Sequence, residues 1–374
     1  MTTTHDDYLQ TPYFGSLDGL RAIAVLGVIW QHVAGPHGGA LGRTGLGVSL
    51  FFAISGFLIT TLLLREHRRN GSISLRRFYI RRTLRIFPLY FAVLGVYLAL
   101  VLLTRADTPE GRTFLQDNLL PYATYTANWF VLGDAAQDAI FYHAWSLATE
   151  EQFYLVWPAI LLGLLAFARR SAVFLAAACA VLAGAVLVDQ IATHAIDGSS
   201  FAPTVLRSIA TPICLGALLA AILHHRHGFE TAGRGLASPL AVPLFALATI
   251  ASLQWLGDPV YAEACMALLV AACCVRADHP LARPLASGPL AFVGVVSYGV
   301  YLMHMLAANS VRPLLGHDFG VDVFAGSALV AIAMAYVSYR FFETPILRLK
   351  ERYGSPAPPS SPARRLATAQ PARS

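Results

Sequence analysis

Long apolar stretches alternate with polar loops along this chain. They lie near residues 17–34, 46–64, 86–104, 145–168, 172–189, 204–223, 236–256, 263–275, 286–308 and 323–342. A helix that crosses the hydrocarbon core of a membrane needs roughly 20 mostly apolar residues. Most of the stretches are close to that length, so the pattern predicts an all-α fold: a polytopic transmembrane bundle of about 10 helices.

The polar ends of the chain divide it into three parts. Residues 1–16 form a polar N-terminal segment, and residues 17–348 hold all the apolar stretches, which predicts a single membrane domain. Residues 349–374 are rich in Pro, Ser, Ala and Arg, and a tail of that composition is expected to be disordered. No internal repeat indicates the paired halves of a transporter.

Composition supports the membrane prediction and excludes other classes. Hydrophobic residues make up 56% of the 374 residues, charged residues 13%, and the mean hydropathy is +0.57, far from an average soluble domain. The net charge of +6 needs no nucleic-acid partner, because cytoplasmic loops and their contact with anionic membrane lipids account for it. The five cysteines lie in apolar stretches without the spacing of a zinc site, which predicts packing roles and no metal.

The distribution of arginine predicts the orientation, because positively charged loops stay in the cytoplasm. The segment 65–85 carries eight arginines, whereas the segment 105–142 carries two arginines and five acidic residues. We therefore expect the first segment inside and the second outside. Both termini are then cytoplasmic, and the expected location is the plasma (inner) membrane.

The first apolar stretch carries two ionisable residues that are costly inside a membrane, Arg21 and His32. They are 11 residues apart, which places them within about 20° of the same helix face and about 16 Å apart along the axis. His32 is suited to act as a general base near neutral pH, or it forms a hydrogen bond between helices. Arg21 either extends to the membrane surface or binds a phosphate or carboxylate.

Arg82 and Arg85 are i, i+3 neighbours at the predicted cytoplasmic end of the third apolar stretch. Guanidinium groups bind phosphate oxygens in a bidentate manner that lysine does not reproduce. The two arginines therefore either contact lipid headgroups or bind a soluble anionic ligand from the cytoplasm.

The fourth stretch begins with Trp145, Glu150 and Glu151. Adjacent carboxylates on a helix point about 100° apart, so at most one of them readily faces a central cavity. The segment is either an interfacial helix start with aromatic anchors, or one carboxylate orients His32 or holds a polar acceptor.

Polar residues recur near the C-terminal end of the chain. Tyr301 and His304 share a helix face at i, i+3, which fits a hydrogen bond between helices or contact with a substrate. Glu343 follows Arg340 at the same spacing, so it either forms a salt bridge at the inner helix end or contacts a substrate.

Other chemistries find little support. There is no G-x-S-x-G, H-E-x-x-H, P-loop or G-x-G-x-x-G motif. A multi-helix transporter of a small polar solute with a proton relay through His32 and Glu150 is the main alternative, but it does not account for Arg82 and Arg85. A polyprenyl-sugar glycosyltransferase usually needs carboxylates in the first outer loop, and residues 35–45 contain none.

Six strings resemble the acyltransferase-3 family of integral membrane acyltransferases, which includes O-antigen, exopolysaccharide and nodulation-factor acetylases and macrolide acyltransferases. The strings occur in the family's order between about Leu17 and Arg348: LDGLRAIAVLGVIWQH, SLFFAISGFLIT, RRTLRIFPLY, WSLATEEQFYLVWP, SYGVYLMH and FFETP. The resemblance implies that an R-x10-H motif on Arg21 and His32 and an R-x-x-R motif on Arg82 and Arg85 are essential. Many relatives carry a further extracytoplasmic domain, which is expected to be absent here.

The resemblance also implies a function. It predicts an O-acyltransferase that takes an acyl group from cytoplasmic acyl-CoA, with acetyl-CoA favoured, to a hydroxyl of a carbohydrate or glycosylated acceptor that is free or lipid-linked. Arg82 and Arg85 would hold the CoA phosphates, and His32 would act as general base or carry the acyl group itself. Arg21 and Glu150 would assist His32. The acceptor is expected to contact residues from the later helices and the start of the fourth: Tyr301, His304, Trp145, Glu151 and Glu343.

Overall fold

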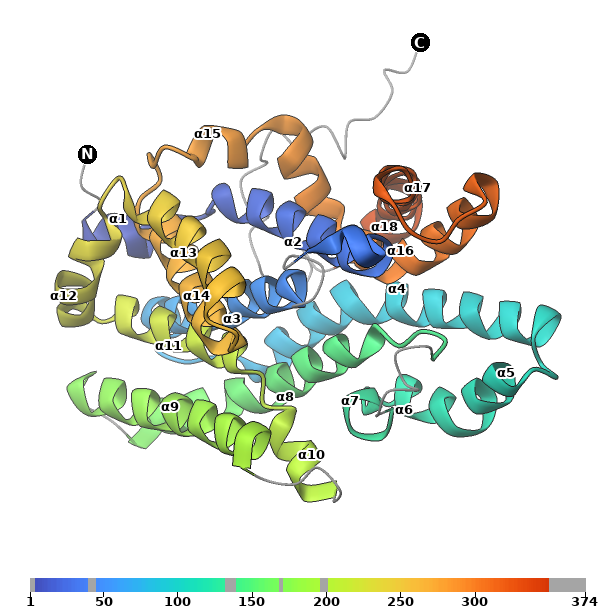
Figure 1. Ribbon diagram of the computed structural model, residues 1–374. Helices are drawn as coiled ribbons and strands as arrows, with labels where there is room; N and C mark the ends of the chain where they lie inside the picture. The colour runs from blue at the N-terminus through green and yellow to red at the C-terminus, as the bar shows by residue number, and fades with distance from the viewer. Residues whose placement is uncertain (1–3, 40–44, 132–138, 168–170, 196–200, 350–374) are drawn as a thin grey trace, which may run out of the picture.

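The computed structural model describes residues 4–39, 45–131, 139–167, 171–195 and 201–349, and in those ranges it contains helices and loops but no strand (Figure 1). The all-α prediction is therefore confirmed. The residues of the predicted disordered tail from 350 onward lie outside the described ranges. The α-helices are α1 (His5–Gln10), α2 (Ser16–Val33), α3 (Leu46–Asn70), α4 (Leu75–Thr104), α5 (Pro109–Thr113), α6 (Leu119–Ala123), α7 (Ala127–Phe130), α8 (Ala144–Phe167), α9 (Ser171–Ala195), α10 (Phe201–Arg207), α11 (Thr211–His224), α12 (Arg226–Leu236), α13 (Ala241–Trp255), α14 (Pro259–Val275), α15 (Ala282–Leu285), α16 (Gly288–Leu315), α17 (Val321–Ser338) and α18 (Thr344–Leu349). A 3-10 helix, η1 (Gly35–Gly38), and two π-helical turns, η3 (Phe114–Asn118) and η5 (Tyr339–Glu343), complete the described elements.

Each predicted apolar stretch lies on a helix or on a pair of helices, but not all of these helices are long and apolar enough to cross a membrane. Six in the described chain are: α3, α4, α8, α9, α16, and α17 with its continuation to Leu349. Helices α12 and α13, bent by 74°, make a seventh if they form one span. A polytopic helical bundle is confirmed, whereas the predicted number of about ten spans is not.

The remaining helices fall short for two physical reasons. Helix α2 has 18 residues but carries Asp18, Arg21 and His32, which lower its hydropathy. Helices α11 and α14 are strongly apolar but have only 14 and 17 residues. Helix α11 is also separated by a short break from α10, so the stretch 204–223 is not one continuous helix.

The outer surface of the bundle is apolar, and several polar groups lie inside it. Leu103, Phe167 and Leu314 are 82%, 93% and 83% exposed, whereas His304 and Thr60 are fully buried. Large exposed apolar surfaces are rare in soluble monomers. Lipid contact requires this arrangement, because hydrocarbon solvates apolar side chains and leaves polar groups unsatisfied.

Helix α2 packs against α3, α16 and α17 and buries most of its residues, although Ile23 is 48% exposed. Glycines allow this close approach: an added Cβ at Gly47 would lie 2.2 Å from the carbonyl oxygen of Ala24, and one at Gly294 would lie 1.9 Å from that of Asp18. Small residues at helix crossings are typical of membrane bundles. The polar residues of α2 are thereby placed among the other helices instead of on the lipid-facing surface.

Two groups of short helices lie at opposite ends of the bundle. In Figure 1, α1 and α12 lie together at the left, while α5 lies at the far right with α6 and α7 nearby. The predicted orientation requires this separation, since it assigns α1 and α12 to cytoplasmic segments and α5 to α7 to an outer loop.

Candidate active site

Three histidine rings meet in the interior of the bundle. His32 is the penultimate residue of α2, His304 lies in α16, and His143 immediately precedes α8. The ring centroids of His32 and His304 are 4.9 Å apart, and those of His143 and His304 are 4.8 Å apart. The structure thus brings two predicted histidines, 272 residues apart in the sequence, into contact.

Backbone hydrogen bonds leave one nitrogen open on two of these rings. Nδ1 of His32 donates to the carbonyl of Val28 over 2.8 Å, and Nδ1 of His304 donates to that of Tyr301 over 2.5 Å. Because a carbonyl only accepts, each neutral ring keeps its lone pair on Nε2. Nε2 of His304 is buried without a hydrogen-bond partner among the described residues. A buried polar atom without a partner needs an explanation, and a donor group on a bound ligand supplies one.

Tyr301 connects the histidines to α8. Its hydroxyl donates to the carbonyl of His143 over 2.9 Å and shares a hydrogen bond of 2.5 Å with Oγ of Ser146. His143 in turn contacts the carbonyl of Leu302 through Nε2 over 3.2 Å. These bonds hold the segment before α8 against α16, so that the positions of His143 and His304 are fixed relative to each other.

A second polar cluster surrounds Arg82. Its Nε lies 3.6 Å from Oε1 of Glu151, with the two side chains only 19% and 14% exposed. Its guanidinium carbon lies 3.5 Å from the centroid of the Tyr154 ring, a cation–π distance. Arg82 is therefore surrounded by groups of the protein itself, and a ligand phosphate would have to share it with Glu151.

Glu150 lies next to this pair. It accepts a hydrogen bond of 2.5 Å from Oγ of Ser55, and the positive charges of Arg82 and Arg21 both act on it. Arg21 itself lies 3.3 Å from Asp18, one turn earlier on α2. Glu150 thus connects α8 to α2, α3 and α4.

Glu343 lies beside Arg85, not Arg340. The charge of Arg85 acts on Glu343, and Oγ of Ser338 donates to Oε1 of Glu343 over 3.4 Å. No ion pair joins Arg340 to Glu343 within this described segment. The reason is local: residues 339–343 form a π-helical turn, whose wider winding displaces the i, i+3 alignment of an α-helix.

The two clusters share helices α2 and α8. Ser146 and Glu150 are four residues apart on α8, so they share a face. Tyr298 and Tyr301 are three apart on α16, and the Tyr298 hydroxyl donates to the carbonyl of Ile86 on α4 over 2.9 Å. We name the combined set the polar seam; its members are Arg21, Arg82, Glu150, Glu151, Tyr298, Tyr301, His32, His143 and His304.

Some predicted residues lie apart from the histidines, and some important ones were missed. Trp145 packs edge-on against Phe52 with ring centroids 6.4 Å apart. His143 was not singled out, because it precedes the fourth apolar stretch. An ionisable residue outside an apolar stretch carries no cost of burial in a membrane, so it gave no signal of function. Ser55 was missed because a lone serine in an apolar stretch carries no sequence signal.

No group of three His, Cys, Asp or Glu side chains is arranged to hold a metal ion in the part of the chain that the structure describes. The side chains present in the polar seam offer acid–base and nucleophilic chemistry, from imidazoles, and electrostatic stabilisation, from arginines.

These features define a polytopic helical membrane protein with a histidine-containing polar site inside its bundle. The sequence matches the family described as an acyltransferase domain (Acyl_transf_3) over residues 14–340. Because the match covers most of its length, the chain belongs to this acyltransferase family. The resemblance predicted from the motifs is thereby confirmed, and the transporter alternative loses its support.

Curated relatives carry O-acetyltransferase names. The protein named "Putative O-acetyltransferase SACOL0978" from Staphylococcus aureus strain COL is 29% identical over 369 residues, which cover 90% of this chain and 58% of the relative. O-acetyltransferase OatA from S. aureus strain NCTC 8325 / PS 47 is 30% identical over 357 residues, covering 89% of this chain and 57% of the relative. The chain thus spans a little more than half the length of these relatives. No solved structure matches it significantly.

Proposed function

We propose that this protein is an O-acyltransferase of the plasma membrane that moves an acyl group, in the simplest case acetyl, from cytoplasmic acyl-CoA to a hydroxyl of a carbohydrate acceptor. The contact between His32 and His304, with Nε2 of His304 buried and unpartnered, carries the proposal. Family membership and the O-acetyltransferase names of the relatives support the reaction class.

His32 has the central role in this proposal. The acceptor oxygen forms a bond to the thioester carbonyl carbon while Nε2 of His32 takes the hydroxyl proton. The carbon–sulfur bond breaks, the proton passes to the departing sulfur, and the products are an ester and the CoA thiol. In a second version Nε2 of His32 attacks the thioester carbonyl carbon, the carbon–sulfur bond breaks and the CoA thiolate leaves. The acceptor hydroxyl then takes the acyl group from Nε2, and its proton passes to the thiolate. Both versions use the same open nitrogen.

His304 and Tyr301 are proposed to contact the acceptor or the thioester, since His304 lies against His32 and Tyr301 holds the neighbouring backbone. Arg82 and Arg85 are proposed to face the CoA phosphates, with Glu151 and Glu343 as their counter-ions when no ligand is bound. The charges of both Arg21 and Arg82 act on Glu150. We propose that its carboxylate continues the row of polar side chains from these arginines to the histidines.

A turnover assay tests the proposal. The full chain is purified in lipid nanodiscs with radiolabelled acetyl-CoA and a carbohydrate acceptor, and release of the CoA thiol is measured. We expect His32→Ala to lower turnover by at least about 100-fold, the usual contribution of a general base. His227→Ala, an exposed histidine on α12, is the matched control and should retain full turnover. Normal turnover by the His32 variant would overturn the role of that residue.

A further inference from the structure

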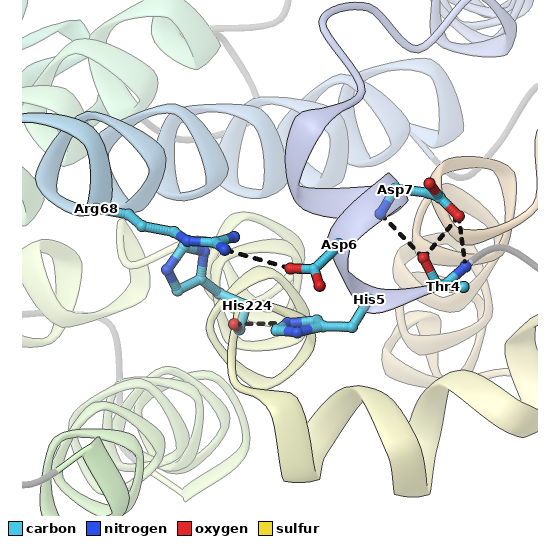
Figure 2. Close-up of polar contacts among 6 residues, drawn as sticks. All are labelled: Thr4, His5, Asp6, Asp7, Arg68 and His224. Atoms are coloured by element: carbon cyan, nitrogen blue, oxygen red, sulfur yellow. Dashed lines mark hydrogen bonds and ion pairs between the residues drawn. The ribbon is translucent and has the colours of Figure 1, made fainter.

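A large cavity lies away from the polar seam, at the end of the bundle where α1 and α12 lie. Its volume is about 870 Å³, and its wall comes from α1, α12, the last turn of α3, the end of α11 and Arg276 after α14. Figure 2 shows part of this wall: Arg68 of α3 points toward Asp6 of α1, and the ring of His5 points toward the backbone of His224.

Cations predominate in this wall. Four arginines line the cavity, against two carboxylates, those of Asp6 and Glu230. The arginines are Arg68, Arg226, Arg234 and Arg276. Asp278, which does not line the cavity, also pairs with Arg276. Three carboxylates therefore offset three of the arginines, and one positive charge remains.

Three of these arginines are held loosely, whereas Arg276 is only 19% exposed, lies 3.0 Å from Asp278 and donates to the carbonyl of Ala237 over 2.7 Å. Arg68 lies 3.3 Å from Asp6, with side chains 48% and 73% exposed, and Arg226 lies 2.9 Å from Glu230, with side chains 81% and 48% exposed. Exposed ion pairs of this kind contribute little and are readily exchanged for another anion. Arg234 has no hydrogen bond or ion pair within the described ranges, although it lies near Glu230.

The histidine at the end of α11 adds no positive charge to this cavity. Burial, and after it the charges of His5 and Arg68, lower the pKa of His224, so the positive potential comes from the arginines. Like charges gathered around one cavity create a potential that a bound anion relieves.

The wall keeps its shape without a ligand. A capping box begins α1: Oγ1 of Thr4 accepts from the amide of Asp7 over 3.2 Å, and Oδ2 of Asp7 accepts from the amide of Thr4 over 3.1 Å (Figure 2). Arg65 donates to the carbonyls of Tyr8 and Thr11, which ties α1 to α3. The cavity is therefore preformed, a property common to ligand sites.

The cavity is distinct from the polar seam. Arg68 lies 13 residues after Ser55 on α3, which corresponds to ~20 Å along the helix axis. A ligand group held by Arg68 is consequently well separated from Glu150 and still farther from His32.

We propose that this cavity binds the phosphate groups of a ligand that reaches it from the cytoplasm. Guanidinium groups suit phosphate because their paired N–H groups match its oxygens, and several are needed to balance more than one negative charge. Two sources offer this chemistry at a membrane surface: the headgroup of an anionic phospholipid and the nucleotide end of acyl-CoA. The second source rests on the proposed function and competes with the assignment of the CoA phosphates to Arg82 and Arg85.

Hydrogen exchange of the peptides that cover α1 and α12 measures whether a ligand protects the wall of the cavity. The full chain is placed in phosphatidylcholine nanodiscs, and CoA or inorganic phosphate is added; in a second arm the nanodiscs contain one-third phosphatidylglycerol and no CoA. We expect at least one arm to slow exchange in α12 by about threefold or more. The double variant Arg226→Gln, Arg234→Gln removes two exposed cations without disturbing the core, and its protection should be lost.

Arg77→Gln is the matched control, since Arg77 is an exposed arginine at the start of α4 outside the cavity. If CoA and phosphate slow exchange in Arg77→Gln but not in the double variant, the site is assigned to the nucleotide. The same pattern with phosphatidylglycerol alone assigns it to the lipid headgroup. If the double variant behaves as Arg77→Gln in every arm, or if no arm protects α12, the proposal is overturned. The readout needs no turnover, so it stands apart from the test of His32.

Discussion

Two buried tyrosines of the same core differ in what their hydroxyls contact. The Tyr301 hydroxyl donates to the carbonyl of His143 and bonds to Ser146, whereas the Tyr97 hydroxyl is buried with no partner in the described chain. The two residues are 6% and 5% exposed. Replacing either tyrosine with phenylalanine removes one hydroxyl oxygen. At position 301 that hydroxyl is hydrogen-bonded, and at position 97 it is not, so the two variants can be compared.

We expect Tyr301→Phe to destabilise the protein by about 1 kcal/mol, because it removes two hydrogen bonds in a membrane interior and leaves the carbonyl of His143 and the hydroxyl of Ser146 only their mutual bond of 3.2 Å. Tyr97→Phe should have no cost or a small gain, since it removes a buried oxygen that has no partner. Unfolding in detergent measures both. Equal losses in the two variants would contradict the hydrogen bonds of Tyr301.

Sequence reasoning identified part of this site. His32, Tyr301 and His304 were predictable because ionisable and hydroxyl groups in apolar stretches are costly and must serve some purpose. Their contact with His143 was not, since it depends on a loop that returns into the bundle before α8. The pairing of Arg82 with Glu151 also escaped prediction, because it depends on the vertical alignment of α4 and α8, which hydropathy does not specify.

At the scale of helices, the Arg82–Glu151 pair connects α4 to α8, and the hydroxyl of Tyr79 adds one bond to the carbonyl of Leu155 over 2.8 Å. Arg82→Gln should cost about 3 kcal/mol, because it leaves the carboxylate of Glu151 mostly buried without its cation. Thermal unfolding in detergent measures this loss. Arg226→Gln, which breaks the exposed pair with Glu230, should cost less than about 1 kcal/mol.

The double variant Arg82→Gln, Glu151→Gln separates structure from ligand binding. It removes both charges, so stability should largely return. If Arg82 also holds acyl-CoA, the KM for acyl-CoA should stay raised in the double variant. Recovery of both stability and KM would limit Arg82 to a structural role.

The close crossing of α2 and α16 determines how the two helices that carry His32 and His304 lie against each other. A Cβ at Gly294 would lie 1.9 Å from the backbone oxygen of Asp18, so Gly294→Ala must push the two helices apart. We expect turnover to fall by at least about tenfold, since a displacement near 1 Å is costly for catalysis. Gly163→Ala on α8 has no heavy atom within 4 Å and should leave turnover unchanged; an active Gly294 variant would argue against a catalytic contact between the histidines.

At the scale of the whole molecule, the fold class was readable from the sequence and the number of spans was not. Apolar stretches predicted where helices lie, because burial in lipid requires both apolar side chains and satisfied backbone groups. Whether α2, α11 and α14 cross depends on their neighbours: polar α2 is shielded by the surrounding helices, and short α11 packs against α3 across Gly56 and Gly216. Hydropathy of one segment does not contain that information.

Thiol labelling of intact cells distinguishes the possible topologies. The exposed positions Arg77 and Arg112 should report inside and outside under every count of spans, so Arg77→Cys and Arg112→Cys calibrate a membrane-impermeant reagent. The five native cysteines lie in apolar helices, and the unsubstituted chain gives their background.

His227 and His317, both exposed, then decide the count. With ten spans, His227→Cys should be protected until the cells are permeabilised and His317→Cys should be labelled at once. With seven spans both cysteines should be labelled at once. With six spans His227→Cys should be labelled at once and His317→Cys should be protected. We expect the ten-span result, because the polar residues of α2 pack among other helices and the arginines of α12 then lie on the positive, cytoplasmic side. Immediate labelling of His227→Cys would place the basic cavity outside the cell, out of reach of acyl-CoA.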